Sequence, residues 1–416
     1  MDFTGYRRFL GHPGVLRLFG GMLVGRLPTG MLSLAIVLRI TSDGGSYRLA
    51  GGIAAAFTLG VAVAFPALSR QIDRRGQTVV LIPCAFATLA SATVLAVLPA
   101  TSAPPLLMAT GALLGATLPP LSSASRTMWP SVLDDPTVID AAYAADATFQ
   151  ELIFIVGPLL VVAIATLVGT AAAIVAAGIL GCAGTLVFAA SRISRAWRAP
   201  VMPGRRNKPL RSPGIRVLAI TMFALVGGFA AEEVAIIAVA RQAGSAGASG
   251  VLLAVWSLSS LVAGFIYGSR TWPGQPAVRV VTLLVATSLV TLALAPQRNL
   301  LVVAGILAVS GLGGAPALSA IYRTAQQVAL PGVVTESYAW LGVGNLVGGA
   351  AGAAVAGQVI TTRGPSDGFI LAAGAIAISA IAIGLGRRSL VEPGAAGPSA
   401  GPAAGPLPRS IAPASG

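Results

Sequence analysis

Long apolar segments occupy most of this chain and restrict what it can fold into. Twelve stretches of about 20 mostly apolar residues alternate with short polar or Pro- and Gly-containing connections. A helix of that length crosses a hydrocarbon core about 30 Å thick. The stretches lie near 16–40, 49–69, 78–98, 105–125, 142–167, 170–190, 217–241, 248–268, 279–296, 299–321, 336–361 and 367–386. They lack the alternation of barrel strands, so we predict an all-α integral membrane protein with twelve transmembrane helices in the lipid bilayer.

The composition excludes several classes of enzyme. Only 10% of the residues are charged, against roughly 25% in an average soluble domain. His12 is the single histidine, and Cys84 and Cys182 lie apart in apolar stretches. Lys208 is the single lysine, and no P-loop pattern surrounds it. The apolar segments therefore hold no histidine for Ser–His or His–metal chemistry, and the sequence holds no P-loop for ATP hydrolysis, so we expect no enzyme, metal or cofactor.

Lysine and arginine are distributed unevenly between the connections. With the N-terminus placed in the cytoplasm, 21 of the 27 basic residues lie on the cytoplasmic side and 5 on the outer side. Such a bias sets the orientation of membrane proteins, so both termini are predicted to be cytoplasmic and the membrane to be the plasma membrane. A net charge of +14 also suits nucleic acid, but the basic residues form no patch with aromatics, and we expect no such partner.

One connection, 191–216, is far more basic than the others and separates six apolar segments from six. We therefore predict an N-terminal six-helix bundle at 1–190, a basic cytoplasmic linker at 191–216 and a C-terminal six-helix bundle at 217–386. The remainder, 387–416, is rich in Pro, Ala and Gly and has little to bury. That composition predicts a disordered cytoplasmic tail.

An internal repeat relates the two predicted bundles. The fourth apolar segment leads into LPPLSSASR and the tenth into APALSAIYR, so an arginine follows each at a helix end. Four identities share an offset of 197 residues: Pro119, Leu121, Ser122 and Arg126 with Pro316, Leu318, Ser319 and Arg323. Parallel repeats with a site between the halves are a transporter arrangement. The bundles are thus predicted to be pseudo-symmetric.

The repeat continues into the fifth and eleventh segments. Tyr143 is followed by Gln150, and Tyr338 by Asn345, each seven residues further on. Seven residues make two helical turns, so the members of each pair share a helix face. These four residues are candidates for a pathway between the bundles.

The connection after the second segment reads SRQIDRRGQT and has a charge pattern of its own. It resembles motif A of the major facilitator superfamily, roughly G-x-x-x-D-R-x-G-R-[KR]. Asp73, Arg74 and Gly76 match, whereas Ser69 and Gln77 depart from the pattern. The resemblance implies a conformational latch, in which a carboxylate at a helix end pairs with arginines and a helix N-terminus. The alternative interpretation is ordinary basic loop charge.

The resemblance to this superfamily extends over most of the chain. EEVAIIAVARQAG in the seventh segment and TESYAWLGVGNLVGG in the eleventh resemble actinobacterial-type members described as drug or metabolite exporters. It implies two bundles that rock about a central cavity. The antiporter motif C is present only in part, because Gly157-Pro158 occurs but Ile153 stands where a glycine would fall.

Ionisable residues inside the apolar segments are few and costly to bury. Arg26 lies in the first segment and Glu151 at a similar depth in the fifth, which favours an Arg26–Glu151 pair. The pair would either exchange partners with substrate or proton, or be a permanent structural ion pair. Asp146, one turn closer to the cytoplasm, is interpreted as hydrated.

Two adjacent carboxylates, Glu232 and Glu233, lie in the seventh segment. Neighbours on a helix point about 100° apart, so they are expected to face different environments. Glu232 shares a face with small residues, whereas the family resemblance favours Glu233 as a proton carrier, and we favour Glu233. Small residues also recur in the eleventh segment at Gly344, Gly348 and Gly352, which predicts close helix packing or a hinge.

Together these features predict a monomeric secondary transporter that works by alternating access. The resemblance favours proton-coupled export of a small organic molecule. Two alternatives stay open, namely an importer or facilitator of a small solute, and a polytopic sensor or partner-binding protein that no longer transports.

Overall fold

The computed structural model describes residues 4–199, 207–245, 248–270, 272 and 276–390, which form helices and turns and no strand. A short helix, α1 (Thr4–Gly11), precedes the first long one. The N-terminal bundle consists of α2 (Val15–Ser42), α3 (Tyr47–Arg75), α4 (Gln77–Val97), α5 (Pro104–Thr117) with α6 (Leu121–Val132), α7 (Pro136–Leu167) and α8 (Thr170–Ala189). The C-terminal bundle consists of α10 (Pro213–Gln242), α11 (Ala248–Gly268), α12 (Pro276–Leu292), α13 (Leu300–Ser310) with η2 (Gly311–Gly313) and α14 (Gly314–Val328), α15 (Val334–Arg363) and α16 (Pro365–Gly386).

The lengths of these helices match a bilayer. Eleven helical stretches in the described residues are long and apolar enough to cross a membrane. The one remaining predicted segment, the ninth in chain order, forms α12 with 17 residues. Its length is about 25 Å at 1.5 Å per residue, which is the short end of the spanning range. The predicted all-α membrane fold, with twelve helical segments in two pseudo-symmetric bundles, is confirmed.

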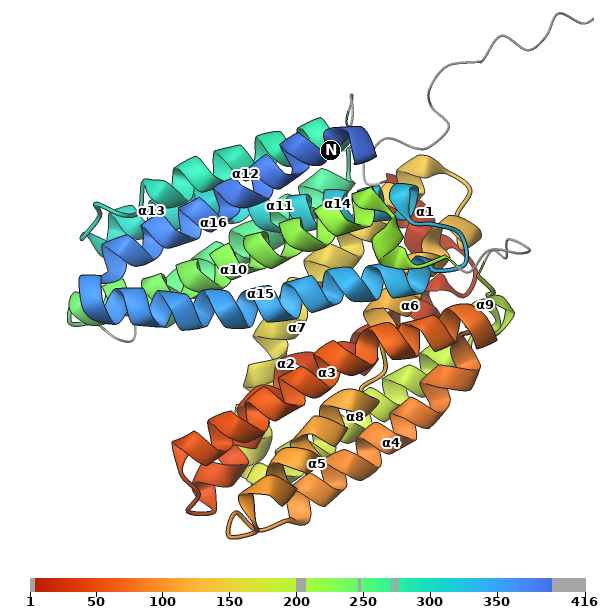
Figure 1. Ribbon diagram of the computed structural model, residues 1–416, viewed down its shortest axis with the longest axis horizontal. Coiled ribbons are helices and arrows are strands. Elements are labelled where there is room, and N and C mark those ends of the chain that lie inside the picture. Colours follow the sequence, from red (N-terminus) through yellow and green to blue (C-terminus); the bar gives the residue numbers. More distant parts are fainter. Residues whose placement is uncertain (1–3, 200–206, 246–247, 271, 273–275, 391–416) are drawn as a thin grey trace, which may run out of the picture.

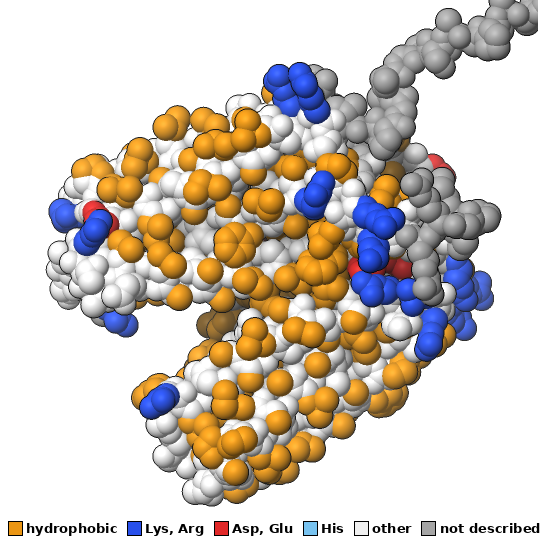
Figure 2. Space-filling model, viewed as in Figure 1, with side chains coloured by type: hydrophobic (Ala, Val, Ile, Leu, Met, Phe, Trp, Pro, Cys, Tyr) orange, Lys and Arg blue, Asp and Glu red, His pale blue; other side chains and the backbone are white. Residues whose placement is uncertain are grey.

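The two bundles diverge at one end and meet at the other, as Figure 1 shows. The closed end holds the connections after α3, α6, α8 and α14, and the open end those after α2, α10 and α15. On the face that Figure 2 shows, hydrophobic side chains are spread over both bundles, Lys and Arg gather toward the ends, and a cleft separates the bundles. This is the distribution expected of a surface that faces lipid.

The fourth and tenth segments are each interrupted at repeat-related positions. The α5–α6 break falls at Leu118–Pro120, where Pro119 and Pro120 have no backbone N–H to continue the helix. The break before α14 is the 3₁₀ turn η2, built from glycine-rich chain. Both breaks aim the following helix, α6 or α14, toward the closed end.

Several helices extend beyond the predicted apolar segments at the closed end. The second was predicted to end at 69, the fourth at 125 and the fifth to begin at 142, whereas α3 ends at Arg75, α6 ends at Val132 and α7 begins at Pro136. The α3 extension is polar, and those of α6 and α7 mix polar and apolar residues, so a search for long apolar stretches misses them. Each extension contributes a contact to the other bundle, since Asp73 and Thr127 bond to Thr335 and Asp140 bonds to Arg323.

The predicted linker and tail contain short ordered elements. Within 191–216 the chain forms α9 (Arg192–Ala196) and η1 (Pro209–Arg211), and α10 begins before 217. The prediction of a disordered tail from 387 is wrong for its first four residues, which form η3 (Arg387–Leu390) with Leu390 buried. Residues 200–206 and 391–416 lie outside the described residues.

Glycine allows the closest helix contacts in both bundles. On α15, a Cβ added at Gly348 would lie 2.2 Å from the Phe223 carbonyl oxygen, and one at Gly352 would lie 2.0 Å from that of Gly227. On α8, a Cβ added at Gly184 would lie 2.1 Å from the Gly25 nitrogen of α2. The predicted small-residue packing on the eleventh segment is confirmed, with α10 as its partner.

We predict that Gly352→Ala lowers the thermal stability of the detergent-purified protein, because overpacking typically costs about 1–3 kcal/mol. Gly357→Ala on the same helix is the matched control, since an added Cβ there meets no atom within 4 Å. The measurement is Tm together with monodispersity on size exclusion. Equal Tm values for the two variants would show that the α10–α15 contact does not need glycine.

Candidate functional site

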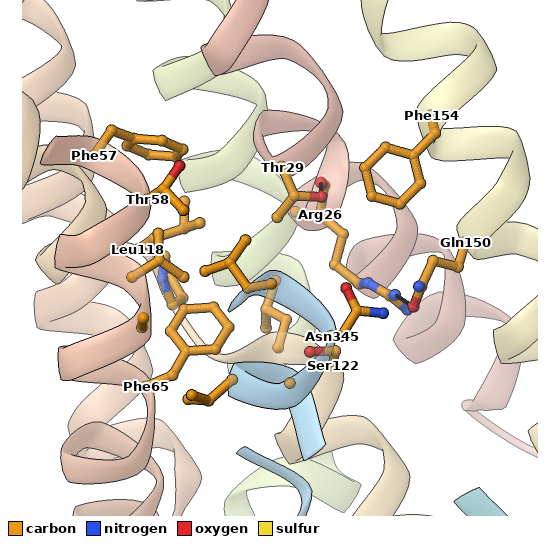
Figure 3. Close-up of a pocket in the computed structure, with 18 of the residues that line it drawn as sticks. Arg26, Thr29, Phe57, Thr58, Phe65, Leu118, Ser122, Gln150, Phe154 and Asn345 are labelled. Atoms are coloured by element: carbon orange, nitrogen blue, oxygen red, sulfur yellow. Dashed lines mark hydrogen bonds between the residues drawn. The ribbon is translucent and has the colours of Figure 1, made fainter. Parts of the chain in front are cut away.

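Two adjoining cavities lie between the bundles. The first, which we call the arginine cavity, has a volume of about 160 Å³. It is lined by Arg26 of α2, Arg126 of α6 and Gln150 of α7 from one bundle, and by Tyr322 of α14 and Asn345 of α15 from the other. In Figure 3 the Arg26 side chain extends toward Gln150 and Asn345. Both halves of the molecule therefore contribute to one polar site.

The second cavity, which we call the glutamate cavity, has a volume of about 660 Å³ and is lined by Glu151 of α7 and Glu233 of α10. Gln150, Phe154 and Asn345 line both cavities, which therefore adjoin. The predicted pathway residues Gln150 and Asn345 thus lie at the junction between an arginine-bearing wall and a glutamate-bearing wall.

A buried ion network forms the arginine wall. Arg26 Nη1 donates to Asp146 Oδ1 at 2.6 Å, and Arg126 Nε donates to Asp146 Oδ2 at 2.5 Å. The Gln150 side-chain oxygen accepts from Nη2 of both arginines, at 2.8 and 3.0 Å. The side chains of Arg26, Arg126 and Asp146 are 6%, 4% and 0% exposed. Two guanidinium groups therefore share one carboxylate in the protein interior.

The expected Arg26–Glu151 pair is wrong, and Asp146 takes the place assigned to Glu151. Asp146 and Gln150 are four residues apart and share the face of α7 that meets α2 and α6. Glu151 points about 100° away from Gln150 and lines the glutamate cavity instead. Asp146 is fully buried, so its interpretation as a hydrated residue is also wrong.

The two adjacent glutamates of α10 occupy different environments, as predicted. Glu233 is exposed and lines the glutamate cavity, which agrees with the preference for it as the cavity-facing residue. Glu232 is fully buried in the C-terminal bundle, where its carboxylate accepts hydrogen bonds from Thr291 Oγ1 at 3.2 Å and Ser310 Oγ at 2.8 Å. Ser310 itself lines the glutamate cavity.

A pair of tyrosines joins the bundles between the arginine wall and the closed end. The hydroxyls of Tyr143 and Tyr338 are 2.9 Å apart and hydrogen-bonded to each other. The Tyr143 hydroxyl oxygen also lies 2.9 Å from the Arg126 carbonyl oxygen, and that of Tyr338 lies 2.9 Å from the Tyr322 carbonyl oxygen. Because each hydroxyl has one proton, one tyrosine donates to its carbonyl while the other donates to the first tyrosine. The two residues that the repeat related therefore meet across the pseudo-symmetry axis with equivalent oxygen–oxygen distances.

Asp73 lies at the closed end and binds the start of a helix in the other bundle. Its two carboxylate oxygens accept from the backbone N–H groups of Thr335 at 3.1 Å and Glu336 at 2.9 Å, in the first turn of α15. A helix N-terminus carries partial positive charge, so this contact is favourable. Arg70 adds a bidentate bond to the Glu336 carboxylate, with distances of 3.0 and 2.5 Å.

The other two residues of the predicted latch have different surroundings. Arg74 is exposed and makes no hydrogen bond or ion pair within the described part of the chain. Gly76 ends α3 with φ of +87°, a conformation that favours glycine, and an added Cβ would lie 2.8 Å from Arg198 Nη1. The arginine that bonds to α15 beside Asp73 is Arg70, one helical turn before it, and not Arg74.

The repeat-related arginines Arg126 and Arg323 both bond to carboxylates of α7. Arg126 is buried on Asp146, whereas Arg323 Nε donates to Asp140 Oδ1 at 2.7 Å and remains partly exposed. The Arg323–Asp140 pair joins the two bundles at the closed end. Asp140 and Arg70 were both missed in the sequence, although each lies within one helical turn of a residue that was identified.

Comparison with known proteins decides the family. The sequence profile of the Major Facilitator Superfamily matches residues 18–353. The chain belongs to this superfamily. Curated proteins gave no match. Membership indicates a multi-pass membrane transporter rather than an enzyme.

Solved structures of superfamily transporters have the same fold. The human organic anion transporter MFSD10 (TETRAN) is 19% identical with a TM-score of 0.69, over 91% of this chain and 99% of its own. A bacterial homologue of the iron transporter ferroportin in an outward-facing state is 12% identical with a TM-score of 0.72, over 90% and 99%. The E. coli fucose:proton symporter FucP is 14% identical with a TM-score of 0.66, over 91% and 99%.

We predict that Asp73→Asn in this superfamily member weakens the closed end, because the helix N-terminus loses its anionic partner. A loss of about 1 kcal/mol changes a two-state population about fivefold. Spin labels at Arg74→Cys and Leu330→Cys, with Cys84 and Cys182 replaced by alanine, should report a larger population of long distances. Asp367→Asn at the start of α16, at the opposite end, is the matched control. An unchanged distance distribution in Asp73→Asn would contradict a latch.

Proposed function

We propose that the protein is a proton-coupled secondary transporter that moves a small organic molecule by alternating access, with export as the direction that the sequence resemblance favours. The observation that carries this proposal is a cavity between two pseudo-symmetric bundles that bears ionisable side chains from both. With the orientation predicted from the Lys and Arg bias, the closed end is cytoplasmic and the structure is outward-facing. The plasma membrane, cytoplasmic termini and a monomeric state belong to the same proposal.

The polar contacts between the bundles at the closed end support such a cycle, because each can break and re-form on its own. The Asp73 contact with α15, the Arg70–Glu336 and Arg323–Asp140 pairs and the tyrosine pair join the bundles there. A typical hydrogen bond contributes about 0.5–1.5 kcal/mol net. Similar contacts formed at the other end would offset their loss, so the bundles would rock between two states of comparable free energy.

Glu233 and Glu151 are the proposed proton carriers. Both line the glutamate cavity, and carboxylates inside a membrane protein commonly belong to proton pathways. The fully buried Glu232 accepts bonds from the hydroxyl groups of Thr291 and Ser310 and would serve as a further proton-binding carboxylate. A protein that had become a sensor without transport would have no need to retain Arg26, Glu151 and Glu233 along one central cavity.

A transport screen tests the proposal directly. The purified protein is placed in proteoliposomes, and a library of small organic molecules is tested for flux with inward, outward and no proton gradient. Flux that changes with the sign of the gradient supports coupled transport, and its direction distinguishes export from uptake. Absence of flux for every compound, with the protein inserted and folded, would favour the sensor alternative.

We predict that Glu233→Gln abolishes accumulation driven by a proton gradient, because the amide cannot carry a proton. Exchange of labelled for unlabelled substrate without a gradient should persist, since binding and rocking do not require proton transfer. Asp367→Asn, which removes a carboxylate away from both cavities, should retain driven accumulation. Full gradient-driven accumulation by Glu233→Gln would remove this residue from the mechanism.

A further inference from the structure

The arginine wall holds more positive charge than its one acid can balance. Arg26 and Arg126 are nearly inaccessible, and Asp146 is the carboxylate that binds both. Gln150 contributes a neutral oxygen, and the Arg126 guanidinium carbon lies 3.5 Å from the Tyr322 ring centroid. A buried charge without a full counter-charge is costly in a membrane protein, so this site favours an added anion.

The two guanidinium groups also have N–H donors that bond to neither Asp146 nor Gln150. Each has five N–H donors and gives one bond to Asp146 and one to Gln150. Both side chains line the arginine cavity, as do Thr29 and Ser122. Paired N–H groups on a planar guanidinium match the oxygens of a carboxylate in spacing and charge.

The rest of this cavity is apolar and aromatic. Phe57, Phe65 and Phe154 line it, together with Leu118 and Leu346. Figure 3 shows Phe57 and Phe65 on α3, across the cavity from Arg26 and Gln150. A ligand that fits these surroundings has one anionic group and an apolar body.

We propose, on the basis of the transport function proposed above, that the substrate is an amphipathic organic anion whose carboxylate binds Arg26 and Arg126. Arg126 is then a substrate-binding residue rather than only a helix-end arginine. The anionic group lies against α2 and α6, because the neighbouring wall bears Glu151 and Glu233. The apolar body lies among the phenylalanines of α3 and α7.

Ligand binding to the detergent-purified full chain tests this inference without requiring transport. The probes are benzoate, 1-naphthoate and 9-anthroate, each compared with its neutral amide of nearly the same shape. We expect at least one carboxylate to raise Tm in a saturable way and its amide to have no effect, because a ligand that binds the folded state stabilises it. Tm measured against ligand concentration gives Kd.

Arg126→Gln is the decisive variant, because it removes the excess charge while leaving the Arg26–Asp146 pair intact. It should weaken carboxylate binding at least about tenfold, as expected when a bond to a charged group is lost. Arg241→Gln is the matched control, since it removes an exposed arginine at the end of α10 and should leave Kd unchanged. A ligand-free Tm close to that of wild type confirms that each variant is folded.

Three results would overturn the anion inference: no stabilisation by any of the three carboxylates, equal stabilisation by an amide, or an unchanged Kd in Arg126→Gln. Gradient-driven flux of a neutral or cationic compound, together with any of these, would leave the transport proposal standing. Carboxylate binding that depends on Arg126, together with absence of flux for every compound in the transport screen, would instead overturn transport and retain the anion site.

Discussion

Charge buried inside a helical bundle needs a partner within reach, and Asp146 is the partner of two arginines at once. Because its two oxygens bond to different helices, one carboxylate of α7 ties α2 and α6 together. The same arrangement orients Gln150 and aims both guanidinium groups at the cavity. The arrangement of the arginine wall therefore follows from a single acidic residue placed where the sequence is otherwise apolar.

Helix α7 links this wall to the closed end of the molecule. Asp140, Tyr143, Asp146 and Gln150 follow one another at spacings of three or four residues, so they lie along one face. Along that face Asp140 bonds to Arg323 and Tyr143 bonds to Tyr338. Asp146 bonds to both Arg26 and Arg126. A shift of α7 caused by a bound molecule would thus reach the contacts between the bundles through rigid helix, without an intervening loop.

The fold and part of the site were predictable, for identifiable reasons. Helix number follows from apolar length, and the meeting of Tyr143 with Tyr338 follows from the repeat and its spacing. Depth along a helix can be counted from the sequence, which placed Arg26 and Glu151 at one level. The direction in which a side chain points around the helix axis cannot be counted in the same way. The fifth segment is apolar on every side apart from a few polar residues, so its sequence does not show which side faces which neighbouring helix. Asp146 was consequently misassigned, and only the packing of α2 and α6 reveals its role.

The two bundles differ in the interactions that hold their own helices together. Within the described residues, the N-terminal bundle has ion pairs in its interior, whereas the C-terminal bundle has none wholly of its own and relies on glycine contacts and hydroxyl groups. Both copies are interrupted along one helix, the first by the Leu118–Pro120 break and the second by the 3₁₀ turn η2. Duplication has therefore kept one helical plan in both copies while the interior ion pairs lie in the first copy alone, among the described residues.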